Sequence, residues 1–183
     1  MTATAKKPMS ADEFLAWSEG QEGRWELHDG VPVAMAPERI AHLQTKGQSF
    51  RSLQAAIERA KLRCEAFPGG ASVRIHDHMV FEPDALVYCG PPLAPNSLEI
   101  PTPIIVVEVL SPNPAAYDHG PKLTGYFSLR SVIHYLILDA DRRVAIHHKR
   151  GVEDVIETRI LSEGMLRLDP PGLQIPVAEL FPI

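Results

Sequence analysis

The spacing of apolar and polar residues predicts a chain of short helices and strands. The longest helix is expected over residues 41–59, where apolar side chains recur at helical intervals: Leu43, Phe50, Leu53 and Ile57. Residues 104–110 (IIVVEVL) are apolar at almost every position, so this segment is expected to be a strand covered on both faces. Helices come first, then a strand meander, a crossover helix and further strands. This order predicts an α/β fold with a central mixed sheet flanked by helices.

Local signals place the flanking elements. Ser10 and Glu13 are spaced as a capping box, which predicts the start of a short helix. Asp29-Gly30 and Gly69-Gly70 each predict a hairpin turn between two strands. The hairpin strands are expected over 24–28 with 31–35 and over 63–67 with 71–76, further strands over 82–89, 134–139, 144–149 and 155–161, and two more helices over 119–129 and 176–181.

Composition indicates one globular domain. The chain has 183 residues, of which 45% are hydrophobic and 22% charged, and these fractions are typical of globular proteins. We expect a flexible tail over residues 1–8 and a single domain over residues 9–183. The net charge of −5 argues against non-specific wrapping of nucleic acid.

The cysteines and the lengths of the apolar segments bear on where in the cell the protein is expected to be found. Cys64 and Cys89 form no CxxC motif, so two reduced, mostly buried thiols are expected rather than a disulfide or a pair of metal ligands. No apolar run reaches the roughly 18 residues that a membrane span requires, and no secretory signal is visible. A cytoplasmic protein without membrane association is therefore expected.

One acidic residue lies inside the most apolar strand. A buried carboxylate such as Glu108 is costly unless it is paired or binds a cation. Asp84 and Glu108 are each twelve positions from Asn96, the centre of the loop between two predicted strands, so simple antiparallel pairing places them opposite each other. Two adjacent carboxylates favour a hard cation such as Mg²⁺. A structural ion pair between Glu108 and a lysine or arginine is the alternative.

Two further groups could complete such a site. Asp118, Lys122 and Tyr126 recur every four residues on the helix after this strand, so they share one face. Lys122 could reach the carboxylates, although an ordinary Asp–Lys surface pair is the better explanation of the triplet taken alone. Glu26 and His28 share one face of the first predicted hairpin and are the second such group. A solvated strand face explains their spacing equally well.

Together these residues resemble the Uma-type restriction endonuclease domain family of the PD-(D/E)XK nuclease superfamily. The resemblance extends from about Pro8 to Ile183. It rests on the order of WELHDG (25–30), Met35-Ala36-Pro37 followed by His42, Pro83-Asp84, VEVLSP (107–112), Asp118, Lys122 and Tyr126, HYLILD (134–139) and Leu180-Phe181.

The resemblance implies a restriction-endonuclease-like α/β core with Mg²⁺ or Mn²⁺ at its edge. Asp84 would be the aspartate of the PD element and Glu108 the acidic residue of the (D/E)XK element. The backbone carbonyl of Val109 would complete the metal site. Glu26 would be the acidic residue that the superfamily often contributes from its first segment.

The lysine of the (D/E)XK element should fall at position 110, where this chain has Leu110. Lys122 is the expected replacement, reaching in from the following helix. The activity implied is metal-dependent hydrolysis of phosphodiester bonds in DNA. If Lys122 does not reach the site, the chain would be a nuclease-fold binding module without catalysis. Hydrolysis of a small phosphoester is a further alternative.

Supporting roles are also expected. His42, on the long helix, could hydrogen-bond a site carboxylate, although packing is the simpler explanation. Arg51, Arg59 and Arg63 lie off the apolar stripe of that helix and could hold DNA phosphates, a solvated charged face being the alternative. A homodimer is expected, because cutting both strands of DNA requires two sites.

Overall fold

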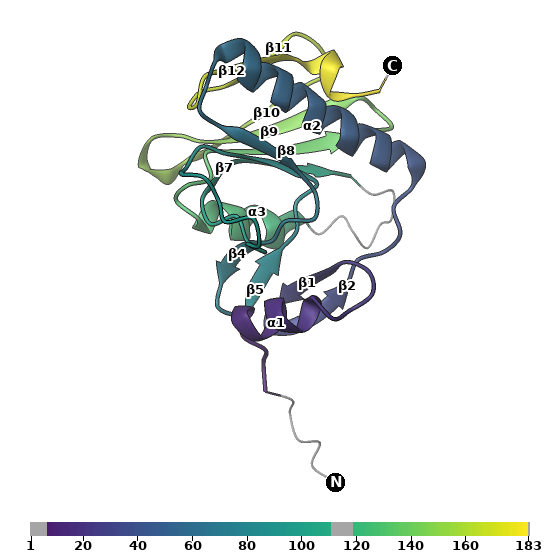
Figure 1. Ribbon diagram of the computed structural model, residues 1–183. Helices are drawn as coiled ribbons and strands as arrows, with labels where there is room; N and C mark the ends of the chain where they lie inside the picture. Colours follow the sequence, from purple (N-terminus) through teal and green to yellow (C-terminus); the bar gives the residue numbers. More distant parts are fainter. Residues whose placement is uncertain (1–6, 111–118, 183) are drawn as a thin grey trace.

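The computed structural model describes residues 7–110 and 119–182 (Figure 1). Asp118, which was predicted to share a helix face with Lys122 and Tyr126, and the family landmark Ser111-Pro112 lie outside the described residues. In Figure 1 a large sheet lies between the helices α2 (Ile40–Ala60) and α3 (His119–Ser128). A smaller sheet lies with the helix α1 (Ala11–Ser18) at the end of the molecule away from α2.

The large sheet is mixed and has the strand order β10-β9-β8-β7-β6-β3. β7 and β8 are parallel and are separated in sequence by the crossover helix α3, while the other neighbouring strands are antiparallel. The predicted fold class is confirmed. The bounds are β3 (Glu65–Pro68), β6 (Ala85–Tyr88), β7 (Pro103–Val109), α3 (His119–Ser128), β8 (His134–Asp139), β9 (Val144–Arg150) and β10 (Ile156–Leu161).

The small sheet is antiparallel, with the order β2-β1-β5-β4, and α1 packs on it. Its elements are α1 (Ala11–Ser18), β1 (Trp25–His28), β2 (Val31–Ala34), β4 (Val73–His76) and β5 (Met79–Phe81). The predicted capping box of Ser10 and Glu13 is present. Asp29 and Gly30 both have positive φ, as the predicted tight hairpin between β1 and β2 requires.

β7 is covered on both faces, as its sequence predicts. Ile105 and Val107 pack in one apolar cluster with α2 (Ile40–Ala60), and Val106 packs in a second cluster that includes Tyr126 of α3. On the predicted stripe of α2, Leu53 and Ile57 are buried, whereas Leu43 is 46% exposed. The hairpin of β11 (Met165–Leu168) and β12 (Leu173–Pro176) also joins the cluster of α2, together with η3 (Val177–Leu180). A further short turn, η2 (Val152–Asp154), precedes β10.

The predicted hairpin around Gly69-Gly70 is wrong. β3 pairs with β6 in the large sheet, whereas β4 pairs with β5 in the small sheet. The two glycines therefore lie where the chain passes from one sheet to the other. A glycine pair favours a sharp change of direction but does not specify which strand pairs with which.

The prediction of two reduced cysteines is also wrong. Cys64 and Cys89 form a disulfide. Glu65 pairs with Tyr88, so the antiparallel register of β3 and β6 places the two cysteines opposite each other just beyond the paired residues. Disulfides persist mainly in oxidising compartments, so this bond gives no support to the expected cytoplasmic location. In the described part of the chain, no helix has the length and apolar character needed to cross a membrane.

Candidate functional site

Asp84 and Glu108 come together where β6 begins and β7 ends. Ala85 pairs with Val107 and Leu86 with Val106, so Asp84 and Glu108 come directly beyond the last paired residues. The amide of Asp84 donates to the carbonyl of Val107 at 3.0 Å. The register irregularity of this strand pair falls between Val87 and Tyr88, and the predicted register is confirmed at Ala85 and Val107, next to the site.

α3 brings two side chains to Glu108. Lys122 Nζ lies 2.8 Å from Glu108 Oε1, and the hydroxyl of Tyr126 donates to the same oxygen at 2.7 Å. Tyr126 is fully buried and Glu108 is 8% exposed. The spacing of four residues on one helix face therefore places both side chains on the same carboxylate.

Lys122 also joins Glu108 to Glu26 on β1. Its Nζ lies 2.9 Å from Glu26 Oε1. Glu26 further accepts a hydrogen bond from the amide of Glu82 and contacts His28 Nε2, both at 2.9 Å. Glu26 is buried, so its face of β1 is not the solvated face that the sequence also allowed.

The other half of the site is centred on Asp84. Its Oδ2 accepts a hydrogen bond from the amide of Val109 at 2.8 Å and lies 3.2 Å from Nε2 of His42. Lys46 Nζ lies 3.1 Å from Asp84 Oδ1. The start of α2 thus supplies an imidazole and an ammonium group to the aspartate that β6 positions.

Glu38, just before α2, completes this half. Lys46 Nζ lies 3.3 Å from Glu38 Oε1, and His42 Nε2 lies 3.9 Å from the same oxygen. Arg24 bonds both Glu38 and, at 2.6 Å, Glu82. The backbone amide of Glu82 reaches Glu26, so this residue connects the two halves.

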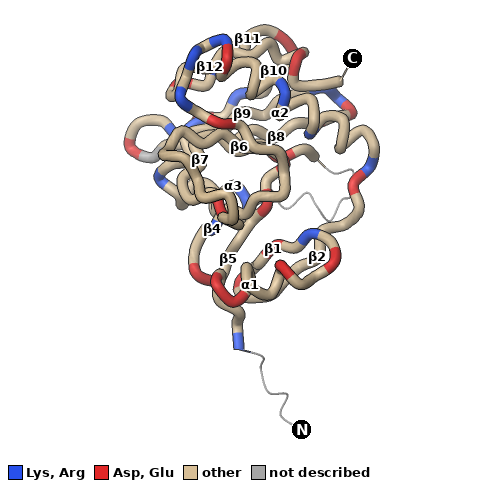
Figure 2. Tube along the Cα trace, viewed as in Figure 1, with Lys and Arg blue, Asp and Glu red and all other residues tan. Residues whose placement is uncertain are grey.

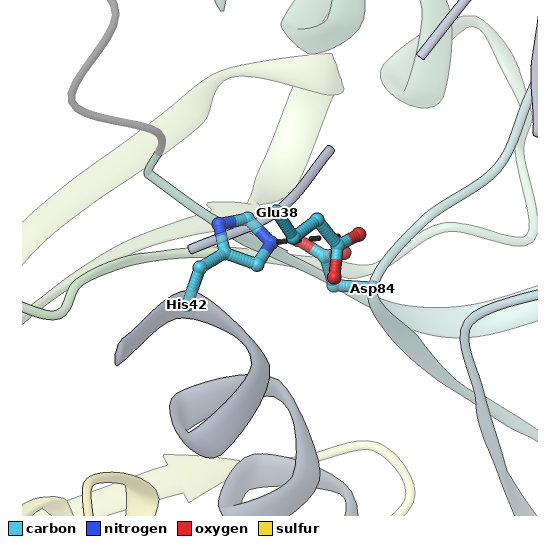
Figure 3. Close-up of side chains that lie close together, drawn as sticks. All are labelled: Glu38, His42 and Asp84. Carbon is cyan, nitrogen blue, oxygen red and sulfur yellow. Dashed lines mark ion pairs between the residues drawn. The ribbon is translucent and has the colours of Figure 1, made fainter. Parts of the chain in front are cut away.

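Glu38, His42 and Asp84 can each offer one ligand atom to a metal ion, and these atoms lie within 4.8 Å of one another. Figure 3 shows the imidazole of His42 directed toward the two carboxylates, with dashed lines marking the ion pairs. Despite its short contact with Asp84, the buried Nε2 atom makes no hydrogen bond of acceptable geometry to any described residue. Two carboxylates and an imidazole are a donor set for a divalent cation. Burial acts against the charge of His42, but Asp84 and Glu38 raise its pKa above the usual value, so a cation held by these three groups would displace the proton of the imidazole.

The site crowds negative charge around Glu108. Burial is the main cause that raises the pKa of Glu108 to about 7; the charges of Asp84 and Glu26 act in the same direction, and Lys122 acts against them. Burial also acts against the charge of Lys122, but the two glutamates on either side raise its pKa well above the usual value. Lys122 is therefore a cation, whereas Glu108 is close to half protonated at neutral pH.

The other two buried carboxylates are strongly ionised. Burial by itself would raise the pKa of Glu26, but the contacts with His28, Lys122 and the Glu82 amide lower it to about 2. For Asp84, His42, Lys46 and the Val109 amide likewise outweigh burial and lower the pKa to about 2. These two groups therefore carry full negative charge at any pH at which the protein is handled.

Sequence reasoning missed four members of this network: Arg24, Glu38, Lys46 and Glu82. His42 and Lys46 are four residues apart, which places them on one face at the start of α2, and Glu38 lies just before that helix. That spacing is a usable signal. Of the predicted residues, Asp84, Glu108, Lys122, Glu26, His42 and Tyr126 all lie in the network, while Val109 contacts it through its amide.

The predicted DNA-binding arginines lie on the outer face of α2 and just after it. Arg51, Arg59 and Arg63 are all exposed, and Arg59 lies 3.7 Å from Glu179. At about 1.5 Å per helical residue, Arg51 is within about 8 Å of Lys46 along the axis, whereas Arg59 is about 20 Å away. Figure 2 shows lysines and arginines spread over many elements, with acidic residues between them.

Comparisons with known proteins bear on the fold and the family of this chain. The uncharacterised protein slr1290 of Synechocystis is 26% identical over 183 residues, with 94% of this chain and 91% of that protein covered. A crystal structure described as a "putative nuclease belonging to DUF820", from Anabaena variabilis, has the same fold, with a TM-score of 0.73 and 17% identity over 95% of this chain and 98% of that one. A family model described as "Putative restriction endonuclease" (Uma2) matches residues 11–178. Because that match spans most of the sequence, the chain belongs to the Uma2 restriction endonuclease family.

Proposed function

We propose that this chain is a metal-dependent nuclease that hydrolyses phosphodiester bonds of DNA, with Mg²⁺ or Mn²⁺ held by Asp84 and Glu108. One observation carries the proposal: within a chain of the Uma2 family, Asp84 bonds the backbone of Val107 and Val109, on either side of Glu108, and Lys122 contacts Glu108 at 2.8 Å. Lys122 thus supplies the positive charge that Leu110 cannot supply at the usual position of the motif.

The residues present fit a divalent cation. The donors are mainly carboxylate oxygens, which are the ligands that Mg²⁺ and Mn²⁺ prefer. Burial and, to a smaller extent, the charges of Asp84 and Glu26 raise the pKa of Glu108, and a cation bound among these three carboxylates would offset both effects. We propose Asp84, Glu108 and the backbone carbonyl of Val109 as ligands.

A second set of ligands shares Asp84. Glu38 and His42 lie on the other side of this aspartate, and the unsatisfied Nε2 of His42 is close to both carboxylates. We propose that these two residues hold either part of the same cation's coordination shell or a second cation. The variants below separate the two sets.

The remaining residues have distinct roles in this proposal. Bound Mg²⁺ or Mn²⁺ supplies Lewis-acid polarisation of the phosphate and a nucleophile at neutral pH. Lys122 would stabilise the negative charge that develops on the phosphate, because it carries a full positive charge beside Glu108. Tyr126 positions the Glu108 carboxylate through its hydroxyl, and Glu26 holds Lys122 from the opposite side. Arg51, Arg59 and Arg63 would contact DNA phosphates, with Arg51 nearest the site.

A second candidate function is a nuclease-fold binding module without catalysis. The observation that favours it is that the main carboxylates already have cationic partners: Lys122 for Glu26 and Glu108, Lys46 for Asp84, and Arg24 for Glu38. A cation would have to compete with these partners. A network that is already neutralised can also be purely structural.

Calorimetry with Mn²⁺ and Mg²⁺, followed by a supercoiled-plasmid assay on the same samples, tests the proposal. Asp84→Asn and Glu108→Gln keep the side-chain volumes, and each should abolish both metal binding and cleavage. Glu163→Gln is a matched control, because this glutamate is exposed in the segment before β11. Loss of affinity in Glu38→Gln and His42→Asn would place a cation on the α2 side.

Each other outcome has a definite meaning. Metal binding without cleavage of plasmid or of a small phosphodiester would favour the binding module. Cleavage of bis(p-nitrophenyl) phosphate but not of DNA would identify a small-phosphoester hydrolase. A wild-type chain that binds neither metal would overturn the proposal and leave Glu108 as a structural ion-pair residue.

A further inference from the structure

β10 has an unpaired edge at the end of the large sheet. It pairs with β9 on one side, and among the described residues no strand pairs with its other side. The strand is accessible on both faces: Ile160 is 73% exposed, and the side chains of Glu157 and Arg159 are 55% and 70% exposed. An open edge of this kind presents unpaired amide and carbonyl groups that can accept another strand.

The other edges of the two sheets are less suited to pairing. β2 carries Pro32 in its middle, β3 ends in Pro68, and β4 has a register irregularity between Arg74 and His76. Proline removes a ladder hydrogen bond, and a bulge bends the edge away. β10 has six residues, no proline and no glycine, so it is the longest regular edge in the described part of the chain.

The sequence of β10 is complementary to itself in the antiparallel direction. If Thr158 lies on a two-fold axis opposite its own copy, Glu157 faces Arg159 and Ile156 faces Ile160. The next pair outward is Val155 with Leu161, which is again apolar. Residues that face each other across an antiparallel ladder lie on the same side of the sheet, and side chains alternate along a strand. The Glu157–Arg159 and Val155–Leu161 pairs therefore lie on one side of the sheet, and the Ile156–Ile160 pairs lie on the other.

We propose that two copies of this chain pair antiparallel through β10, with Thr158 on the two-fold axis, to form one continuous sheet. The pairing would satisfy the open backbone edge and cover Ile160 against Ile156 of the second copy. It would also form two Glu157–Arg159 pairs between the copies, in place of the 3.8 Å contact that these two side chains make within one chain. The interface is isologous, as a closed two-fold dimer requires. The proposal concerns assembly alone, so it stands or falls independently of nuclease activity.

Charge reversal tests this arrangement on the intact chain by sedimentation equilibrium. The wild type should be a dimer. Arg159→Glu places Glu157 opposite a second glutamate in two symmetric pairs, so dimerisation should weaken about 30-fold, taking roughly 1 kcal/mol for each pair. Glu157→Arg should weaken it similarly through two arginine pairs. Arg167→Glu, on an exposed position of β11, is a matched control that should leave the dimer intact.

Two rescue experiments make the test specific. The double variant with Glu157→Arg and Arg159→Glu restores acid opposite base and should dimerise like the wild type. An equimolar mixture of the two single variants should form a heterodimer. A monomeric wild type, an unaffected Arg159→Glu variant, or a mixture that fails to pair would each overturn the proposal.

A covalent test addresses the register. Thr158→Cys places a thiol next to its own copy at the two-fold axis, so mild oxidation should link two chains. Cys64 and Cys89 are already bonded to each other and should not interfere. Met165→Cys, 45% exposed on β11, should remain a single chain under the same oxidation. Failure of the Thr158→Cys variant to cross-link while the wild type is dimeric would exclude this register.

Discussion

Lys46 reaches Asp84 across the space that a side chain at Gly69 would fill. Its Nζ lies 3.1 Å from Asp84 Oδ1, whereas a Cβ atom at Gly69 would lie 2.4 Å from Nζ and 2.6 Å from the neighbouring Cε. The absence of a side chain at Gly69 therefore permits the ion pair at Asp84.

Gly69→Ala should displace the ammonium group from Asp84 and strengthen cation binding. The φ angle of Gly69 is not positive, so alanine does not strain the backbone dihedral angle. The main clash is with the end of the flexible Lys46 side chain, and the added Cβ would also lie 3.1 Å from the Pro83 carbonyl oxygen, which must shift by a few tenths of an ångström. Removing a nearby positive charge should lower the Mn²⁺ dissociation constant by about tenfold in Lys46→Met, and by less in Gly69→Ala. Calorimetry measures both values.

Gly20→Ala is the control for this pair of variants, because the nearest atom to its added Cβ is the Trp17 carbonyl oxygen at 3.8 Å. Unchanged or weaker Mn²⁺ binding in Lys46→Met would mean that the ammonium group supports the site rather than competing for Asp84.

Tyr126→Phe should destabilise the protein by about 2 kcal/mol. The variant keeps the buried ring but removes the hydroxyl that donates to Glu108, and hydrogen bonds to charged groups contribute about 1.5–3 kcal/mol. Tyr135→Phe is the matched control, because the buried hydroxyl of Tyr135 has no hydrogen-bond partner among the described residues. That variant should be neutral or slightly stabilising in urea unfolding, and equal losses in both variants would contradict this account.

Lys122→Gln should cost about 3–5 kcal/mol of unfolding free energy at pH 7, because it leaves Glu26 and Glu108 buried without their shared cation. Saturating Mn²⁺ should recover part of this loss by neutralising the same carboxylates. Urea unfolding with and without the metal measures both effects. Lys61→Gln, at the exposed end of α2, should change neither value.

Buried histidines should make the protein less stable below pH 6.5. His134 and His147 contact each other at 2.9 Å, and burial lowers the pKa of His134 to about 4 and that of His147 to about 3. The unfolded chain therefore binds more protons than the folded one between pH 6.5 and about pH 4. Their contribution to stability is complete above pH 6.5 and is lost as the pH falls, by at most about 1.4 kcal/mol per pH unit for each imidazole.

Glu108 acts in the opposite direction, because its raised pKa of about 7 makes the folded state bind the extra proton between about pH 4.5 and 7. The test is therefore the difference between the wild type and His147→Gln, measured by urea unfolding from pH 7.5 to 5. The variant should show the smaller decline in stability with acidification. Parallel declines would show that His147 does not titrate on unfolding.

The sequence predicted the part of the fold that local patterns determine. The register beside Asp84 and Glu108 was predicted because Ala85 and Val107, which do pair, are equally distant from Asn96, although the strand pair is irregular between Val87 and Tyr88. The same reasoning failed at Gly69-Gly70, because glycines mark a change of direction but the pairing of β3 with β6 depends on distant residues. The disulfide between Cys64 and Cys89 was missed for the same reason.

The candidate site was predictable only where acids stand in apolar surroundings. Glu108 is conspicuous because six of the seven residues in its segment are apolar. Glu38 and Lys46 are not conspicuous, because charged residues before and within the first turns of a helix usually form a solvated face. Only tertiary packing reveals that this face is directed at Asp84.

The crowding of carboxylates around Glu108 ties cation binding to proton release. A group that is half protonated near pH 7 must lose its proton when a cation binds there. The apparent affinity for Mg²⁺ or Mn²⁺ should therefore rise steeply from pH 6 to 8. The heat measured on binding should also depend on the ionisation enthalpy of the buffer, because the buffer takes up the released proton.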